Sequence, residues 1–169
     1  MRSEILPPPG PAAPEDWRPG EVPDPPATSA PLHLLRPFAR WRWRGKGDIT
    51  TVEQAEEYVA HIASLGFGEF YTGTARAPTR AREMKGGSLY FVRDKVTLFR
   101  MPFLRVEFDR ETARRFQGEV LVIMRPELIR VERQHVGFLR GWRYLADEDA
   151  PRDLTAEEAA LPQWYREGA

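Results

Sequence analysis

The class of the fold is set by the segment SLYFVRDKVTLFRMPFLRVEF, residues 88–108. Two runs rich in β-branched and aromatic residues lie on either side of Asp94 and Lys95. A two-residue connection between two such runs is typical of a β-hairpin, so the sequence predicts two antiparallel strands here. Pro102 lacks the backbone N–H that a sheet ladder needs, which predicts that it splits the second strand or confines it to an edge.

Further strands are predicted on both sides of this hairpin. PLHLLRPFARWRW starts as an apolar run and then alternates Trp41 and Trp43 with arginines, which indicates rings on one face and arginines on the other. EVLVIM is a continuous apolar run of the kind found in a buried strand. The expected strands span residues 32–43, 69–75, 88–93, 96–108, 119–124 and part of 135–145.

One principal helix is predicted, over about residues 51–65. Thr50 with Glu53 three residues later fits a capping box, and Gly66 supplies a C-terminal stop. Apolar residues recur between them at helical spacing, with glutamates on the outer face. The apolar positions are Val52, Ala55, Tyr58, Val59, Ile62 and Leu65.

One helix beside five to six short strands predicts an α+β domain with a mainly antiparallel sheet, either open or closed into a barrel-like form. We expect this single domain to span residues 31–154. Residues 1–30 are rich in proline and are expected to be a disordered tail, and residues 155–169 an acidic C-terminal tail or a short helix capped by Thr155.

The net charge of zero conceals a pattern along the chain. Residues 1–32 carry 2 basic and 5 acidic side chains, residues 33–145 carry 21 and 13, and residues 146–169 carry 2 and 7. A basic body between acidic ends favours an anionic partner, and a solubility role explains the pattern equally well. Without cysteine, a long apolar run or a signal-peptide stretch, we expect a cytoplasmic protein that does not enter a membrane.

No catalytic signature is recognisable. His33, His61 and His135 do not stand at metal-ligand spacing, and Ser88 after two glycines lacks the flanks of a nucleophile elbow. We therefore expect no cofactor and no metal, and binding is favoured over catalysis. Gly86, Gly87 and Gly141 indicate turns or a close approach of two backbone segments.

Arginines and aromatic rings are the stronger signal. Arginine contacts phosphate through two donors at once and stacks on rings, and exposed rings stack on unpaired bases. The alternative is that the rings are core and the arginines are solvated. The candidate residues for binding a nucleic acid or another anion are Arg76, Arg80, Arg82, Arg100, Arg143, Tyr90, Trp142 and Tyr144.

The order of several short motifs resembles a bacterial family known as domain of unknown function 1489. The motifs are PTR at 78–80, GGSLYFV at 86–92, RPEL at 125–128, GFLRGWRYL at 137–145 and DAPRDL at 149–154. The resemblance extends from Leu32 to Leu154 and implies kinship without a mechanism. A weaker resemblance, at the level of strand order, is to PUA-like and ASCH-like small β-barrels, which hold RNA or modified bases.

Three functions are compatible with these observations. The favoured hypothesis is a non-catalytic module that binds nucleic acid, with RNA or another single strand as the partner. The second is an assembly factor that engages a protein through residues 1–30 and the acidic end. The third is a small enzyme with an arginine-lined pocket for an anionic substrate.

Overall fold

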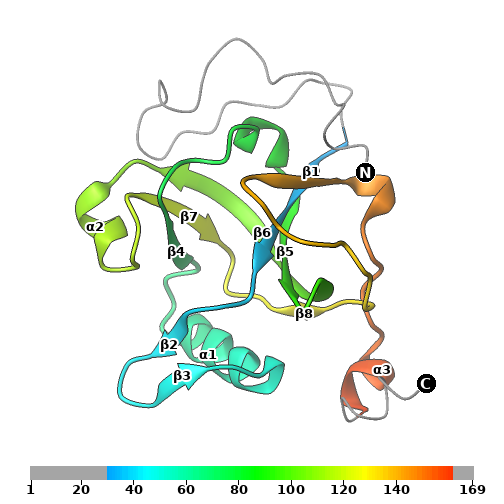
Figure 1. Cartoon of the computed structure of the whole chain (residues 1–169). Coiled ribbons are helices and arrows are strands. Elements are labelled where there is room, and N and C mark those ends of the chain that lie inside the picture. Colours follow the sequence, from blue (N-terminus) through cyan, green and yellow to red (C-terminus); the bar gives the residue numbers. More distant parts are fainter. Residues whose placement is uncertain (1–29, 162–169) are drawn as a thin grey trace.

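The computed structural model describes residues 30–161 and has an α+β architecture built on one mixed, mainly antiparallel sheet (Figure 1). The strand order is β4-β7-β6-β5-β1-β9, and β8 pairs with β6 outside this path. The seven strands are β1 (Leu32–Pro37), β4 (Phe70–Thr74), β5 (Ser88–Arg93), β6 (Val96–Glu107), β7 (Val120–Met124), β8 (Ile129–Arg130) and β9 (Arg143–Ala146).

The β5–β6 hairpin forms as the sequence predicts. Asp94 and Lys95 both adopt positive φ, 53° and 67°, which matches the twist of a two-residue hairpin turn. The expectation for Pro102 is wrong, because β6 is one continuous strand in the middle of the sheet. Pro102 lies where the partner of β6 changes from β8 to β7, and its carbonyl accepts a hydrogen bond from the Arg125 amide. The missing N–H of Pro102 therefore interrupts the hydrogen bonds of β6 with neither β8 nor β7.

The chain does not continue as one strand from Leu32 to Trp43. β1 runs parallel to β5 and ends at Pro37, and Arg40 then takes a φ of 64°, which redirects the backbone. β2 (Trp41–Trp43) pairs with β3 (Gly47–Ile49) in a separate two-stranded hairpin. The strand count is thus nine in residues 30–161, more than the five to six expected.

The principal helix, α1, spans Val52–Ser64. Its cap is shifted by one residue from the prediction: Thr51 accepts from the Gln54 amide at 3.1 Å, and the Gln54 side chain accepts from the Thr51 amide. The shorter helices are α2 (Arg110–Arg114), α3 (Ala156–Ala160) and the 3₁₀ turns η3 (Ala81–Met84) and η4 (Asp147–Asp149). Thr155 and Glu158 form the capping box of α3.

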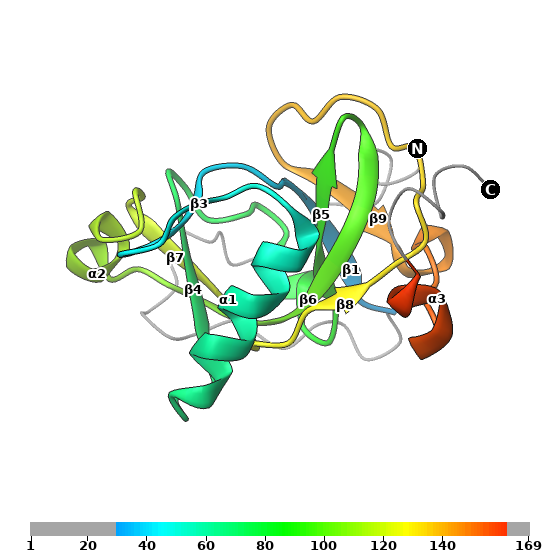
Figure 2. The same cartoon turned by 90° about the horizontal axis from the view of Figure 1, so that it is seen from below.

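Apolar side chains fill both faces of the sheet. On one face, α1 packs Val52, Ala55 and Val59 into the main core with rings of the central strands. On the other face, the segment around Val131 and Val136 covers β1 and β5, and α2 covers β7. Figure 2 shows α2 and α3 at opposite ends of the molecule, with α1 between them.

Within residues 30–161 the sheet is not closed into a barrel, because β4 and β9 stand at its two ends. The prediction of a disordered tail over residues 1–30 falls almost wholly outside the described residues, and so do residues 162–169 of the acidic end. No helix in the described part of the chain has the length and apolar character needed to cross a membrane.

Candidate functional site

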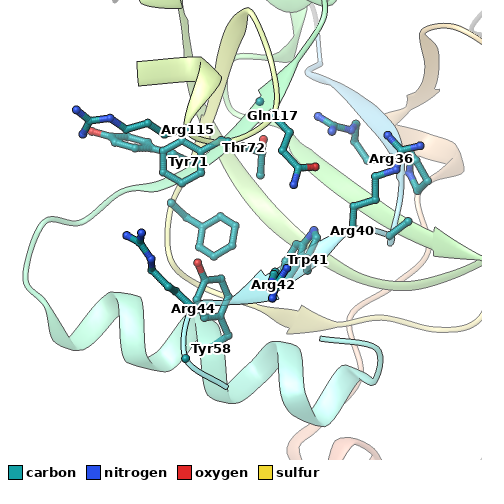
Figure 3. A pocket seen from close by; sticks show the side chains of 16 residues that line it. Arg36, Arg40, Trp41, Arg42, Arg44, Tyr58, Tyr71, Thr72, Arg115 and Gln117 are labelled. Atoms are coloured by element: carbon teal, nitrogen blue, oxygen red, sulfur yellow. The ribbon is translucent and has the colours of Figure 1, made fainter. Parts of the chain in front are cut away.

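A pocket of about 870 Å³ opens between the β1–β2 connection, α1, β4 and the loop after α2. We call it the arginine cleft. Its walls come from four separate parts of the chain (Figure 3). The lining residues are Arg36, Pro37, Ala39, Arg40, Trp41, Arg42, Arg44, Gly45, Tyr58, Phe70, Tyr71, Thr72, Gly73, Arg115, Phe116 and Gln117.

Five of these sixteen residues are arginines and none is acidic. Within the described residues, these five side chains have no hydrogen bond or ion pair with a carboxylate. A concave surface lined by charge of one sign concentrates its field and attracts counter-ions. The arginine cleft is therefore a candidate site for an anion.

At least seven of the fourteen described arginines outside the cleft pair with a carboxylate. Arg100 holds Asp153 through Nε and Nη2, each at 2.8 Å, and Arg130 holds Glu56 with Nε at 2.9 Å. Further pairs join Arg80 to Glu83, Arg105 to Glu69 and Glu107, and Arg152 to Glu158. The five cleft arginines have no such partner in the part of the chain that the structure describes, which makes them candidates for contact with a ligand.

Arg36 is the most enclosed cation of the cleft. Its Nη1 is buried without a hydrogen-bond partner, while the rest of the side chain is partly exposed and lines the pocket. Burial lowers the pKa of Arg36 to about 10, so the guanidinium remains charged at neutral pH. A buried charge without a partner is costly, and native proteins retain few such groups without a functional reason.

Aromatic rings form much of the remaining wall. Trp41 packs its ring 5.2 Å from the ring of Phe70 and 5.2 Å from that of Phe91, so it belongs to the core and to the cleft at once. Burial raises the pKa of Tyr58, and the hydrogen bond to Glu69 raises the pKa of Tyr71. Both phenols are therefore neutral at ordinary pH and can offer ring faces to a ligand.

Two residues of the cleft have backbone conformations that side chains other than glycine rarely adopt. Arg40 has a φ of 64° and Gln117 a φ of 61°, and they lie on different walls. Left-handed conformations at non-glycine residues store strain and gather at functional sites. This strain is a second reason, independent of charge, to single out the cleft.

The residues predicted from the sequence do not share one surface. Arg80 is buried, pairs with Glu83, and donates its backbone N–H to the Tyr144 hydroxyl at 2.8 Å. The Tyr144 hydroxyl also lies 3.1 Å from Thr79 Oγ1. Arg80 and Tyr144 are thus brought together, as an internal contact that joins η3 to β9.

Arg100, Tyr90 and Arg143 belong to the opposite face of the sheet. Arg100 pairs with Asp153 and donates to Ser88 Oγ at 2.9 Å, and Tyr90 is buried beside His33. Arg143 precedes Tyr144 in β9 and lies on the other face of the strand, where its Nη1 donates to the Phe138 carbonyl at 2.7 Å. It does not meet Arg80 across a groove.

The other predicted positions are scattered. Arg76 is exposed, Arg82 is half-buried in η3, and Trp142 packs against the main core. Gly86 and Gly141 adopt positive φ, 88° and 57°, as turns require. A Cβ on Gly87 would lie 2.2 Å from the Leu32 carbonyl oxygen, so this glycine permits a close approach of two backbone segments.

His33 forms a second polar cluster with Asp147 and Ser88. Its Nδ1 accepts the Ser88 backbone N–H at 2.9 Å, so its Nε2 carries the hydrogen and donates to Asp147 at 2.8 Å. The Ser88 hydroxyl is held by Arg100 instead of by the imidazole. His33 therefore cannot activate Ser88 as a base, and the cluster joins β1, β5 and η4 as a structural contact.

A comparison with known families matches residues 45–167, well over half of the chain, to the family described as protein of unknown function (DUF1489). The chain belongs to the DUF1489 family. No curated protein and no solved structure matches the chain. The resemblance to DUF1489 is thereby confirmed, whereas the PUA-like analogy stays a prediction.

The matched range divides the cleft of this DUF1489 protein. The arginines from Arg36 to Arg44 precede it, whereas Tyr58, the β4 residues and Arg115 lie inside it. Sequence reasoning noted Arg40 to Arg44 as an interleaved run but missed Arg36, Arg115 and Gln117. The available signal for Arg36 was a single cation within the otherwise apolar strand LHLLRP.

Proposed function

We propose that this DUF1489 protein binds single-stranded nucleic acid, with RNA favoured, in the arginine cleft, and that it is a binding module without catalytic activity of its own. The observation that carries the proposal is the convergence of five arginines, which have no carboxylate partner among the described residues, beside the at least partly exposed rings of Trp41, Tyr58, Tyr71 and Phe116. Guanidinium groups bind phosphates, and flat rings stack on unpaired bases of any sequence.

A binding role is favoured over an enzyme by the residue types in the cleft. The described lining residues include no histidine, serine or carboxylate that would serve as a general base or nucleophile. His135 lies elsewhere, in a bridge to Val96. The two tyrosines have raised pKa values, which leaves them protonated and weakly basic at neutral pH.

The test is a titration of a fluorescently labelled single-stranded RNA of about ten nucleotides, and of the matching DNA, at about 50 and about 200 mM salt. Binding should weaken steeply with salt, because phosphate contacts release counter-ions. Arg44→Gln and Arg115→Gln should each weaken RNA binding by about fivefold and reduce the salt dependence.

The matched control is Arg140→Gln, which removes the same charge from an exposed position outside the cleft. This variant should bind RNA like the wild-type protein. Absence of binding at the lower salt concentration would refute the proposal. Equal losses in Arg140→Gln and Arg44→Gln would show that net charge, and not the cleft, attracts the RNA.

A further inference from the structure

Arg36 differs from two other enclosed arginines, Arg80 and Arg130, in having no carboxylate partner among the described residues. Arg80 and Arg130, whose side chains have relative exposures of 9%, each have a carboxylate in contact. Arg36 Nη1 is covered and has no hydrogen-bond partner. Since the fold supplies internal partners to the guanidinium groups of Arg80 and Arg130, the partner of Arg36 is expected to come from outside the described residues.

The place of Arg36 in the cleft restricts what this partner can be. Arg36 and Arg40 lie at one end of the pocket, and Arg115 lies toward the other end, with Gln117 and rings between them (Figure 3). Arg36 is the second-to-last residue of β1, and Arg40, with a positive φ, follows four residues later and lines the same pocket. The two cations therefore flank one recess.

We propose that Arg36 and Arg40 form a subsite for a terminal phosphate monoester, so that the arginine cleft holds the phosphorylated end of a nucleic-acid strand. This inference rests on the proposed function and names its substrate class. An internal phosphodiester continues into a sugar on both sides, which prevents it from entering a recess around an enclosed guanidinium. A terminal phosphate is connected to a sugar on one side only, so it can enter this recess ahead of the rest of the strand.

Charge favours the same ligand. A phosphate monoester carries close to two negative charges at neutral pH, whereas a phosphodiester carries one. Arg36 and Arg40 both line the pocket and have no carboxylate partner among the described residues, so two guanidinium groups match the charge of the monoester. The rings of Trp41 and Tyr71 then lie where the first bases stack, and Arg115 where a following phosphodiester passes.

The experiment compares three labelled RNAs of about six nucleotides, a length that matches a single binding groove, with the full-length protein at about pH 7.5. One RNA has a 5′-phosphate, one a 3′-phosphate, and one hydroxyl groups at both ends. One of the phosphorylated RNAs should bind about tenfold more tightly than the hydroxyl-ended RNA. The preference should fall at about pH 5.5, where the monoester loses its second charge.

Two variants assign the preference to the subsite. Arg36→Gln and Arg40→Gln should each lower the preference for the phosphorylated RNA over the hydroxyl-ended RNA to less than about twofold. The Arg40 side chain is exposed, so its replacement leaves the packing of the core intact. Circular dichroism confirms folding of both. Arg140→Gln should keep the full preference.

The outcomes separate the two proposals. Equal affinity for all three RNAs overturns the terminal-phosphate subsite and leaves nucleic-acid binding standing. A nucleoside monophosphate that binds in an Arg36-dependent manner while every RNA fails to bind supports the subsite and refutes the proposed function, since the ligand is then a free nucleotide. Failure of the RNAs and of the nucleoside monophosphate overturns both.

Discussion

Gly73 on β4 and Gly118 before β7 are in direct backbone contact: a Cβ on Gly73 would lie 2.8 Å from Gly118 N and 2.3 Å from the Phe116 carbonyl oxygen. No larger residue fits at either position without moving the main chain. This contact places the loop that carries Arg115 and Gln117 over β4, and so it forms one wall of the arginine cleft.

Gly73→Ala is therefore expected to destabilise the protein by about 2 to 3 kcal/mol and to weaken RNA binding, because the added methyl group displaces this wall. Gly141→Ala is the matched comparison. Its Cβ meets nothing within 4 Å, and only the positive φ of 57° opposes it, so a loss of about 1 kcal/mol is expected. Urea unfolding measures both changes, and equal losses would contradict the steric explanation.

Arg36→Met should raise the free energy of unfolding by about 1 to 2 kcal/mol at pH 7 while it weakens binding. The pKa of Arg36 is lowered to about 10, so the unfolded chain holds this proton more tightly than the folded one. The charged Arg36 therefore lowers the free energy of unfolding below about pH 10. This destabilisation declines as the pH rises toward the pKa of Arg36 in the unfolded chain.

The stability advantage of Arg36→Met should accordingly shrink between about pH 9.5 and 11, as measured by urea unfolding of both proteins. Arg100→Met is the control, for which we expect the free energy of unfolding to change in the opposite direction. It leaves Asp153 and Ser88 without their common donor, so it should destabilise the protein. An Arg36→Met variant less stable than wild type would show that the guanidinium is a structural contact.

His33 should make the protein less stable below neutral pH. Burial lowers the pKa of His33 more strongly than the hydrogen bond to Asp147 raises it, and the nearby charge of Arg100 lowers it further. Because the folded pKa lies below the unfolded one, the contribution to stability is complete above about pH 6.5 and is lost as the pH falls through the folded pKa.

Protonation of Nδ1 removes the acceptor for the Ser88 N–H, which is the physical cause of this loss. His33→Gln retains an acceptor and a donor without a titrating group. Its free energy of unfolding should change less than that of wild type between about pH 7.5 and 5.5, a window above the range in which carboxylates titrate. Parallel pH profiles of the two proteins would exclude His33 as the titrating group.

Tyr144→Phe tests whether this ring binds a ligand or supports the fold. The hydroxyl accepts the Arg80 backbone N–H in a buried position, so its removal leaves that donor unsatisfied and should cost about 1 to 3 kcal/mol of stability. RNA affinity should remain close to wild type once folding is complete, because Tyr144 does not line the cleft. Lost affinity with unchanged stability would instead support the surface predicted from the sequence.

The sequence by itself determined the elements whose signals are local. The Asp94–Lys95 turn, the apolar run of β7 and the spacing of α1 depend on neighbours within a few residues, and the ordered motifs identified the DUF1489 family. The end of β1 and the separate β2–β3 hairpin were not predicted, because an arginine in an otherwise extended run carries no sign that its φ is positive.

The tertiary structure alone decided which arginines are available to a ligand. For several arginines the neutralising carboxylate lies far away in the chain, 53 residues in the pair Arg100–Asp153 and 74 in Arg130–Glu56. Composition and periodicity do not contain that information, since folding brings these partners together through the sheet. Arg36 and Arg130 each stand at or near the end of a short strand, and only the fold gives Arg130 a carboxylate and leaves Arg36 facing a pocket.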